Sequence, residues 1–161
     1  MAPIVAYLFT LAAGTGHIVY ALLPVIAEVS RSAGVRPERP LSISVIASQQ
    51  AMTASPISAA TAALLGLLGP SLSSQAATVV TLMPAGVALG LGAPAMIAMF
   101  PSVNGYFFLP TYATLLTAIS FDQTGTTKIG KYVLNHSFML PGMVSTVLSV
   151  VIGFGLAKLI F

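Results

Sequence analysis

Charged side chains are nearly absent from this chain of 161 residues, and their absence excludes an ordinary water-soluble domain. Only 6% of the residues are Asp, Glu, Lys or Arg, whereas a typical globular domain carries about 25%. Positions 40–121, 1–27 and 132–157 contain no charged residue at all. Because a bilayer-spanning helix needs roughly 20 apolar residues, these runs provide room for about five membrane segments. The sequence therefore predicts an all-α integral membrane protein.

Cysteine is absent as well, so no disulfide framework can form. The start of the chain has no basic region and no cleavage site, so we expect no cleavable signal peptide. Since the chain begins almost inside its first membrane segment, we expect a truncated or reduced start.

Basic residues account for the net charge of +3 and gather in two loops. Arg31, Arg36 and Arg39 lie in the first loop, and Lys128 and Lys131 lie in the second. Cytoplasmic loops of membrane proteins carry an excess of Lys and Arg, so both loops are expected on the cytoplasmic side. The positive charge thus indicates membrane orientation, and we expect no nucleic-acid partner.

The apolar segments that are present are interrupted midway. The first, 3–29, is broken at 14–17, where two glycines serve a turn that folds the segment into two short helices. The second, 41–68, is broken at 53–58, because Pro56 cannot donate a helical hydrogen bond. We therefore expect discontinuous helices in the first half of the chain.

The second half shows a similar pattern and then a simple helix. A third segment begins at 73–78 and continues to about residue 89. A fourth, 96–119, is interrupted at 104–105 and again at 109–111. The last segment, 138–161, has no interruption and is typical of a membrane-spanning helix.

The order of these features repeats along the chain. Each repeat has a small polar cluster, a proline, a turn and a Pro-broken helix, within one transport-core domain that covers 1–161. The predicted parts are unit A at 3–68 (tip 14–17, break 53–58), unit B at 69–120 (tip 73–78, break 104–112), a basic loop at 121–136 and a final helix at 137–161. Paired broken segments are typical of secondary transporters with a binding site between the repeats.

Irregular backbone is tolerated in a membrane only where protein buries it or a wet cavity solvates it, so the interruptions are expected to surround one polar site. Helix N-termini there favour carboxylates, and free carbonyls could hold a cation. Because 40–121 contains no Lys or Arg, an anion would depend on N–H groups and hydroxyls. The candidate substrate-binding residues are Gly14, Thr15, Gly16, His17, Thr53, Ser55, Pro56, Ser58, Ser74, Gln75, Thr78, Pro110, Thr111 and Tyr112. No metal site and no cofactor are predicted.

Two interpretations stay open for several of these residues. His17 titrates near neutral pH, so it could carry a proton or donate to a substrate carboxylate. It could equally bond a neighbouring carbonyl and hold the turn. The hydroxyls of Thr53, Ser55 and Ser58 could likewise bond carbonyls that Pro56 leaves free.

Catalytic motifs are missing. The sequence has no H-E-x-x-H, and Asp122 and His136 form only a nominal triad with any of the many serines. We expect Asp122 to cap a turn and His136 to lie at the start of the last helix. The sequence therefore predicts a protein that is not an enzyme.

Several stretches resemble one known family: GTGHIVYALLPVIAEV, RPERPLS, TASPISAAT, SSQAAT, NGYFFLPTY and, most specifically, FDQTGTTKIGKYVLNHSFMLPG. The chain resembles the anaerobic four-carbon dicarboxylate carriers (Dcu type) of bacterial inner membranes. That resemblance implies antiport or uptake of fumarate, succinate, malate or aspartate, most typically fumarate entering as succinate leaves. The family is similar in plan to the ion transporter superfamily, which implies that GTGH and SSQA are paired hairpin tips beside paired broken helices.

Members of that family are several hundred residues long, which implies that this chain is a core without its scaffold. The first arm of the second hairpin is expected to be missing, so 76–91 either crosses alone or borrows 60–72 as that arm. We favour the second topology because it keeps both basic loops cytoplasmic. A core this short is expected to work as a homo-oligomer in the lipid bilayer.

Substrate-for-substrate exchange is the favoured mechanism, because no Asp or Glu lies in 40–121 to relay a proton. A truncated or engineered membrane fragment that does not transport is the alternative. An intramembrane enzyme that uses His136 and Asp122 ranks third.

Overall fold

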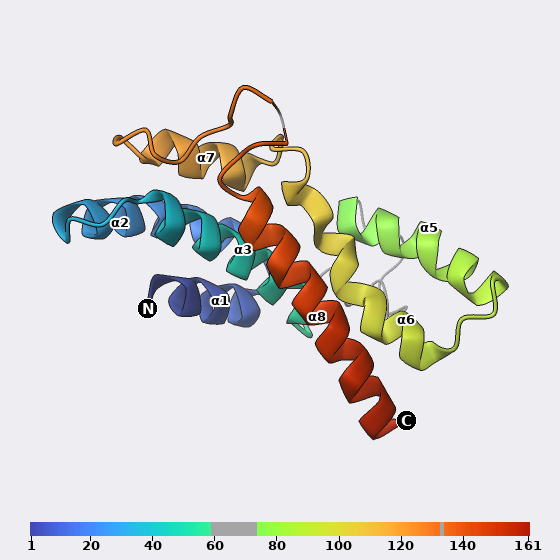
Figure 1. Ribbon diagram of the computed structural model, residues 1–161. Helices are drawn as coiled ribbons and strands as arrows, with labels where there is room; N and C mark the ends of the chain where they lie inside the picture. Colours follow the sequence, from blue (N-terminus) through green and yellow to red (C-terminus); the bar gives the residue numbers. More distant parts are fainter. Residues whose placement is uncertain (59–73, 133) are drawn as a thin grey trace.

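The computed structural model describes residues 1–58, 74–132 and 134–161, and these residues are helical with no β-strand (Figure 1). The helices are α1 (Ala2–Ala13), the 3-10 helix η1 (Gly16–Ile18), α2 (Val19–Ser32), α3 (Glu38–Ala54), α5 (Ser74–Ala88), α6 (Ala93–Met99), the 3-10 helix η2 (Phe100–Phe107), α7 (Ala113–Phe121) and α8 (Met139–Ile160). One isolated antiparallel bridge joins Ile129 to His136. The predicted all-α class is confirmed for the described residues.

The ends of α1 and α3 coincide with the interruptions that the sequence predicts. α1 stops at Gly14, whose φ of 65° is left-handed and therefore suits glycine. α3 stops at Ser55, which is extended at φ −73° and ψ 126°. Extended geometry is expected there, because Pro56 disfavours the helical region for the residue before it.

The second half is interrupted at 108–112, between η2 and α7. At 104–105 the chain stays helical, but in the tighter 3-10 form. α5 begins at Ser74 and continues through Pro84. The proposed arm at 60–72 and the first residue of the predicted tip, Ser73, lie outside the described residues.

Within the described residues, one helix is long and apolar enough to cross a membrane, namely α8. The other described helices are shorter, in line with segments that the sequence predicts to be interrupted. At 1.5 Å per residue, the 12 residues of α1 span only about 18 Å, less than the roughly 30 Å of a hydrocarbon core. α1 and α3 are short because they end at a glycine and before a proline, respectively.

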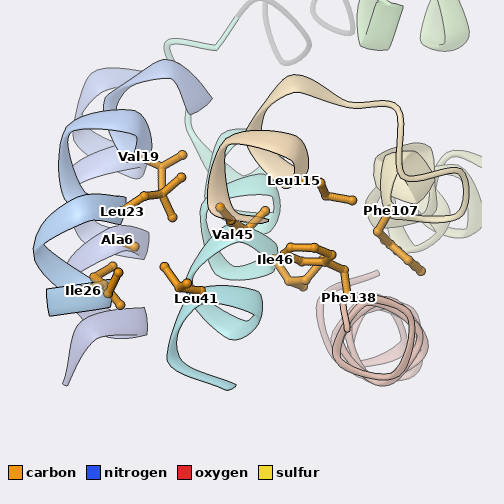
Figure 2. Packing of buried hydrophobic residues seen from close by; sticks show 12 residues of the cluster. Ala6, Val19, Leu23, Ile26, Leu41, Val45, Ile46, Phe107, Leu115 and Phe138 are labelled. Atoms are coloured by element: carbon orange, nitrogen blue, oxygen red, sulfur yellow. The ribbon is translucent and has the colours of Figure 1, made fainter. Parts of the chain in front are cut away.

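The buried core lies on both sides of α3 (Figure 2). Leu41, Val45 and Ile46 project from α3 in the middle of the cluster. Ala6 of α1 lies on one flank with three residues of α2, and the other flank holds residues of η2, α7 and the start of α8. The flanking residues are Ala6, Val19, Leu23 and Ile26 on the first side, and Phe107, Leu115 and Phe138 on the second. α3 therefore connects the two halves of the chain.

α8 packs on η2 and α6 through two glycines. A Cβ on Gly142 would collide with the ring of Phe107, and a Cβ on Gly153 would lie 2.8 Å from the carbonyl oxygen of Ala98. Most other apolar side chains of α8 are exposed. An exposed helix that is apolar all round suits a lipid environment.

Candidate functional site

The predicted tip at 14–17 and the predicted break at 53–58 lie against each other. The Ser55 hydroxyl donates to the carbonyl of Leu11 in the last turn of α1, at 2.8 Å. A Cβ on Gly14 would lie 2.7 Å from the Ile57 side chain and 3.1 Å from the Ile57 backbone. Two segments far apart in the sequence therefore meet at a close backbone approach that needs a glycine.

The polar residues of the tip organise a short 3-10 turn. The Thr15 hydroxyl accepts a hydrogen bond from the backbone N–H of His17, at 3.3 Å. The exposed ring of His17 stacks on Tyr20, with 5.9 Å between the ring centroids. Among the described residues the ring thus packs on an aromatic neighbour, in place of the carbonyl bond that the sequence suggests.

Tyr20 connects the tip to the second interruption. Tyr20 on α2 and Tyr112 both pack against the same hydrophobic core. Tyr112 is the extended residue at which 108–112 ends and α7 begins. The stack of His17 on Tyr20 and the shared core of Tyr20 and Tyr112 therefore place the predicted tip of unit A and the predicted break of unit B beside one hydrophobic cluster.

Sequence reasoning missed Tyr20. The sequence could have indicated Tyr20 by its position three residues after His17, because this spacing places the two side chains on one helical face. The partnership with Tyr112 has no signal in the local sequence, because the two residues belong to different segments.

The residues in and just after the second interruption differ in their exposure to solvent. Pro110 is buried, whereas Thr111 is exposed and its backbone N–H donates to the carbonyl of Leu109, at 2.7 Å. Thr114, in the first turn of α7, has 2% of its surface exposed. The first N–H groups of a helix have no partner within the helix, so the start of α7 can receive an acceptor.

The hydroxyls near Pro56 largely serve the helix itself. The Thr53 hydroxyl donates to the carbonyl of Gln49, at 3.2 Å. Ser58 is buried, and its backbone N–H donates to the carbonyl of Ser55, at 3.3 Å. With the bond from Ser55 to Leu11, this pattern supports the structural interpretation of Thr53 and Ser55.

The predicted tip of unit B lies apart from this group. Figure 1 shows α5, which carries Ser74, Gln75 and Thr78, on the far side of α6 and η2 from α1 and α3. The side chains of these three residues lie outside the described part of the chain. The structure therefore brings together the tip of unit A and both helix breaks. The tip of unit B is not part of this group.

Asp122 caps the loop that follows α7, as the sequence predicts. One carboxylate oxygen accepts hydrogen bonds from the backbone and hydroxyl of Thr124, and the other accepts from the Thr126 hydroxyl and the Thr127 backbone. Burial alone would raise the pKa of Asp122, but the hydrogen bonds from Thr124, Thr127 and Thr126 outweigh it and lower the pKa to about 2. A carboxylate held in this way has a structural role.

His136 is buried just before α8, again as predicted. Its Nδ1 accepts a hydrogen bond from the backbone N–H of Phe138, at 3.2 Å. Burial lowers the pKa of His136, and the backbone of Phe107 and Phe108 partly offsets this effect. The ring therefore caps the start of α8 through Phe138, and the nominal triad with Asp122 has no support in this geometry.

The family described as anaerobic C4-dicarboxylate membrane transporter matches residues 1–72 and 68–161. The chain belongs to this family. The family is one of transporters rather than enzymes, and the resemblance seen in the sequence is confirmed.

Individual relatives match over roughly half of the chain. The C4-dicarboxylate transporter DcuA of Wolinella succinogenes is 47% identical over 89 residues, which are 55% of this chain and 21% of that protein. DcuA of Escherichia coli K12 is 48% identical over 87 residues, or 54% and 20%. The anaerobic C4-dicarboxylate transporter DcuB of Escherichia coli O6:H1 is 42% identical over 92 residues, or 57% and 21%.

The chain thus spans about a fifth of the length of these curated relatives. No solved structure matches the chain.

Proposed function

We propose that this chain is the core of a multi-pass secondary transporter that exchanges or takes up C4-dicarboxylates across the bacterial inner membrane. Its substrates are fumarate, succinate, malate or aspartate. One observation carries the proposal: in a chain of this family, the tip at 14–17 lies against the break at 53–58, and Tyr20, which stacks on His17, packs on the same core as Tyr112.

Dipoles and hydroxyls bind the substrate in this proposal. Thr15 and His17 contribute from the tip, and Thr111 and the first N–H groups of α7 contribute from the second break. Tyr20 lies between them and positions both sets. Ser55 and Gly14 position the tip on α3. Ser74, Gln75 and Thr78 on α5 join the site when the two units adopt a different relative arrangement during transport.

Exchange of one dicarboxylate for another is the proposed mechanism. No Asp or Glu lies in 40–121 to carry a coupled proton, so alternating access would be driven by the substrates themselves. The two units at 3–68 and 69–120 act as the paired elements around the site. The proposed transporter is a homo-oligomer.

Counterflow in proteoliposomes tests this proposal. Vesicles that contain the purified protein are loaded with unlabelled succinate, and labelled fumarate is added outside. We expect uptake of label that depends on internal succinate. We also expect Tyr20→Phe to raise the KM for fumarate with a smaller effect on kcat, because in this proposal the hydroxyl helps to position both sets of binding groups and is not itself changed by transport.

Matched controls locate the site. Tyr132→Phe removes a phenol hydroxyl from an exposed loop position, and Ser120→Ala removes an exposed hydroxyl from α7 outside the break. Both variants are expected to transport like the unaltered protein. Equal kinetic changes in these controls and in Tyr20→Phe would contradict the assigned site.

A non-transporting membrane fragment is the second candidate, since one described helix is long enough to cross a membrane. Such a fragment would fold, or assist a full-length relative, without moving substrate. Well-folded protein that shows no counterflow at any internal succinate concentration would favour it over transport.

A further inference from the structure

A pocket of about 440 Å³ lies where α3 and α8 begin, away from the proposed transport site. Three parts of the chain line it: the first two turns of α3, the end of the basic loop and the first turn of α8. The lining residues are Glu38, Arg39, Ser42, Ile43, His136, Ser137, Leu140 and Pro141. Nothing in the transport proposal uses this pocket.

The pocket lies at the membrane surface. α8 is the described helix that can cross a bilayer, so its first turn, with Leu140 and Pro141, lies where hydrocarbon meets headgroups. Ile43 and Leu140 on the pocket rim are exposed at 44% and 74%. This apolar rim continues into the exposed face of α8, so a ligand there can keep an apolar part in the bilayer.

The polar side of the pocket carries the carboxylate of Glu38 and the guanidinium of Arg39, which form no ion pair with each other. Within the described ranges, the ion pair closer than 4 Å joins Arg31 to Glu28, and Arg39 forms none. The Ser137 hydroxyl donates to one carboxylate oxygen of Glu38, at 2.7 Å, and itself accepts from the backbone N–H of Lys128, at 3.2 Å. These bonds hold the Glu38 carboxylate in place at the pocket.

We propose that this pocket binds the headgroup of a zwitterionic phospholipid, phosphatidylethanolamine. The phosphate pairs with the Arg39 guanidinium, which suits phosphate oxygens. The primary ammonium donates hydrogen bonds to the Glu38 carboxylate. The acyl chains follow Ile43 and Leu140 onto the lipid-facing surface of α8.

Charge selects this lipid over the other common headgroups. An anionic glycerol headgroup brings no cation to Glu38. A choline headgroup carries a cation, but its quaternary ammonium has no N–H to donate. Of these three headgroups, ethanolamine is the one that satisfies both side chains with charge-assisted hydrogen bonds.

Native mass spectrometry tests the site on the full chain. The protein is purified in mild detergent with equal amounts of phosphatidylethanolamine, phosphatidylglycerol and phosphatidylcholine. We expect retained phosphatidylethanolamine in clear excess. Glu38→Gln and Arg39→Gln are each expected to reduce its retention about tenfold, as for loss of one hydrogen bond to a charged group.

The controls separate binding from folding. Arg36→Gln removes a charge from the same loop but does not line the pocket, so retention is expected to stay unchanged. In Glu38→Gln the amide oxygen can still accept from Ser137, so the thermal unfolding midpoint is expected to stay close to that of the unaltered protein. Soluble glycerophosphoethanolamine is expected to compete poorly, because it lacks acyl chains for the apolar rim.

Four results would overturn the assignment. They are preference for phosphatidylglycerol, equal retention of phosphatidylcholine, retention that neither variant changes, and full competition by glycerophosphoethanolamine. The test reads bound lipid and needs no transport, so its outcome is independent of the counterflow result.

Discussion

Gly14 is the residue on which the contact between α1 and α3 depends most directly. It combines a left-handed backbone with a close approach to both the side chain and the backbone of Ile57. A left-handed conformation costs a residue with a Cβ roughly 1–2 kcal/mol. The close approach adds a steric cost that only tertiary contact creates.

Gly14→Ala is therefore expected to destabilise the protein by more than the backbone cost alone. Gly34→Ala is the matched control, because Gly34 also has a positive φ, at 69°, but a Cβ there meets nothing within 4 Å. Thermal unfolding in detergent measures both. Equal losses of stability in the two variants would show that the Ile57 contact is not tight in solution.

Asp122 makes the stability of the folded protein depend on pH in the acid range. Its folded pKa of about 2 lies below its ordinary value of 3.8, so the stabilisation is complete above the ordinary value and is lost as pH falls from about 4 to about 2. A shift of this size corresponds to about 2 kcal/mol. We expect Asp122→Asn to unfold at a lower temperature at pH 7 and to approach the unaltered protein at pH 2.

Glu28→Gln serves as the comparison for Asp122. Glu28 pairs with Arg31 on the exposed surface of α2, where an ion pair contributes little stability. We expect Glu28→Gln to unfold at the same temperature as the unaltered protein, both at pH 7 and at pH 2. A similar acid response in Asp122→Asn and the unaltered protein would show that the loop is not held by the carboxylate.

At the scale of elements, α8 approaches the backbone of α6 closely at Gly153. Gly153 faces the backbone of Ala98, whereas Gly155, two positions further along, has open space where a Cβ would lie. Small residues at helix interfaces are the usual way in which membrane helices come close. The contact between α6 and α8 should thus depend on one glycine and not on its neighbour.

Gly153→Ala is expected to lower the unfolding temperature, because the added methyl group meets the carbonyl of Ala98. Gly155→Ala is expected to leave it unchanged or raise it, since alanine favours a helix over glycine by about 1 kcal/mol. Thermal unfolding of the two purified variants measures the difference. A loss of stability in Gly155→Ala as large as in Gly153→Ala would mean that both faces of α8 pack against protein.

For the whole molecule, the two basic loops lie at the same end. Arg31 at the end of α2 and Pro37 just before α3 line one pocket together with Gln123 and Thr124, which follow α7. The bond from Ser137 to Glu38 joins the same two regions. This arrangement fits the expectation from charge that both loops face the cytoplasm.

Labelling of single cysteines tests this topology, and the chain offers a background without native cysteine. We expect a membrane-impermeant maleimide to modify Ser32→Cys and Gln123→Cys from the cytoplasmic side. Leu159→Cys, at the far end of α8 (Figure 1), should be modified from the opposite side. Labelling of Ser32→Cys and Gln123→Cys from different sides would contradict the arrangement.

Local chemistry determined much of this protein from the sequence alone. The helix ends at Gly14 and Ser55, the loop cap at Asp122 and the span of α8 follow from backbone freedom, proline, hydrogen-bonding capacity and an unbroken apolar run. Each depends on residues that are neighbours in the chain. For that reason the sequence could predict them.

Tertiary structure alone decided which of these features meet. The placement of Gly14 on Ile57, the shared core of Tyr20 and Tyr112, and the pocket between α3 and α8 join segments far apart in the sequence. It also showed that the other described helices are shorter than a span. Such contacts depend on how buried side chains fill space around α3, and a pattern along a single chain does not carry that information.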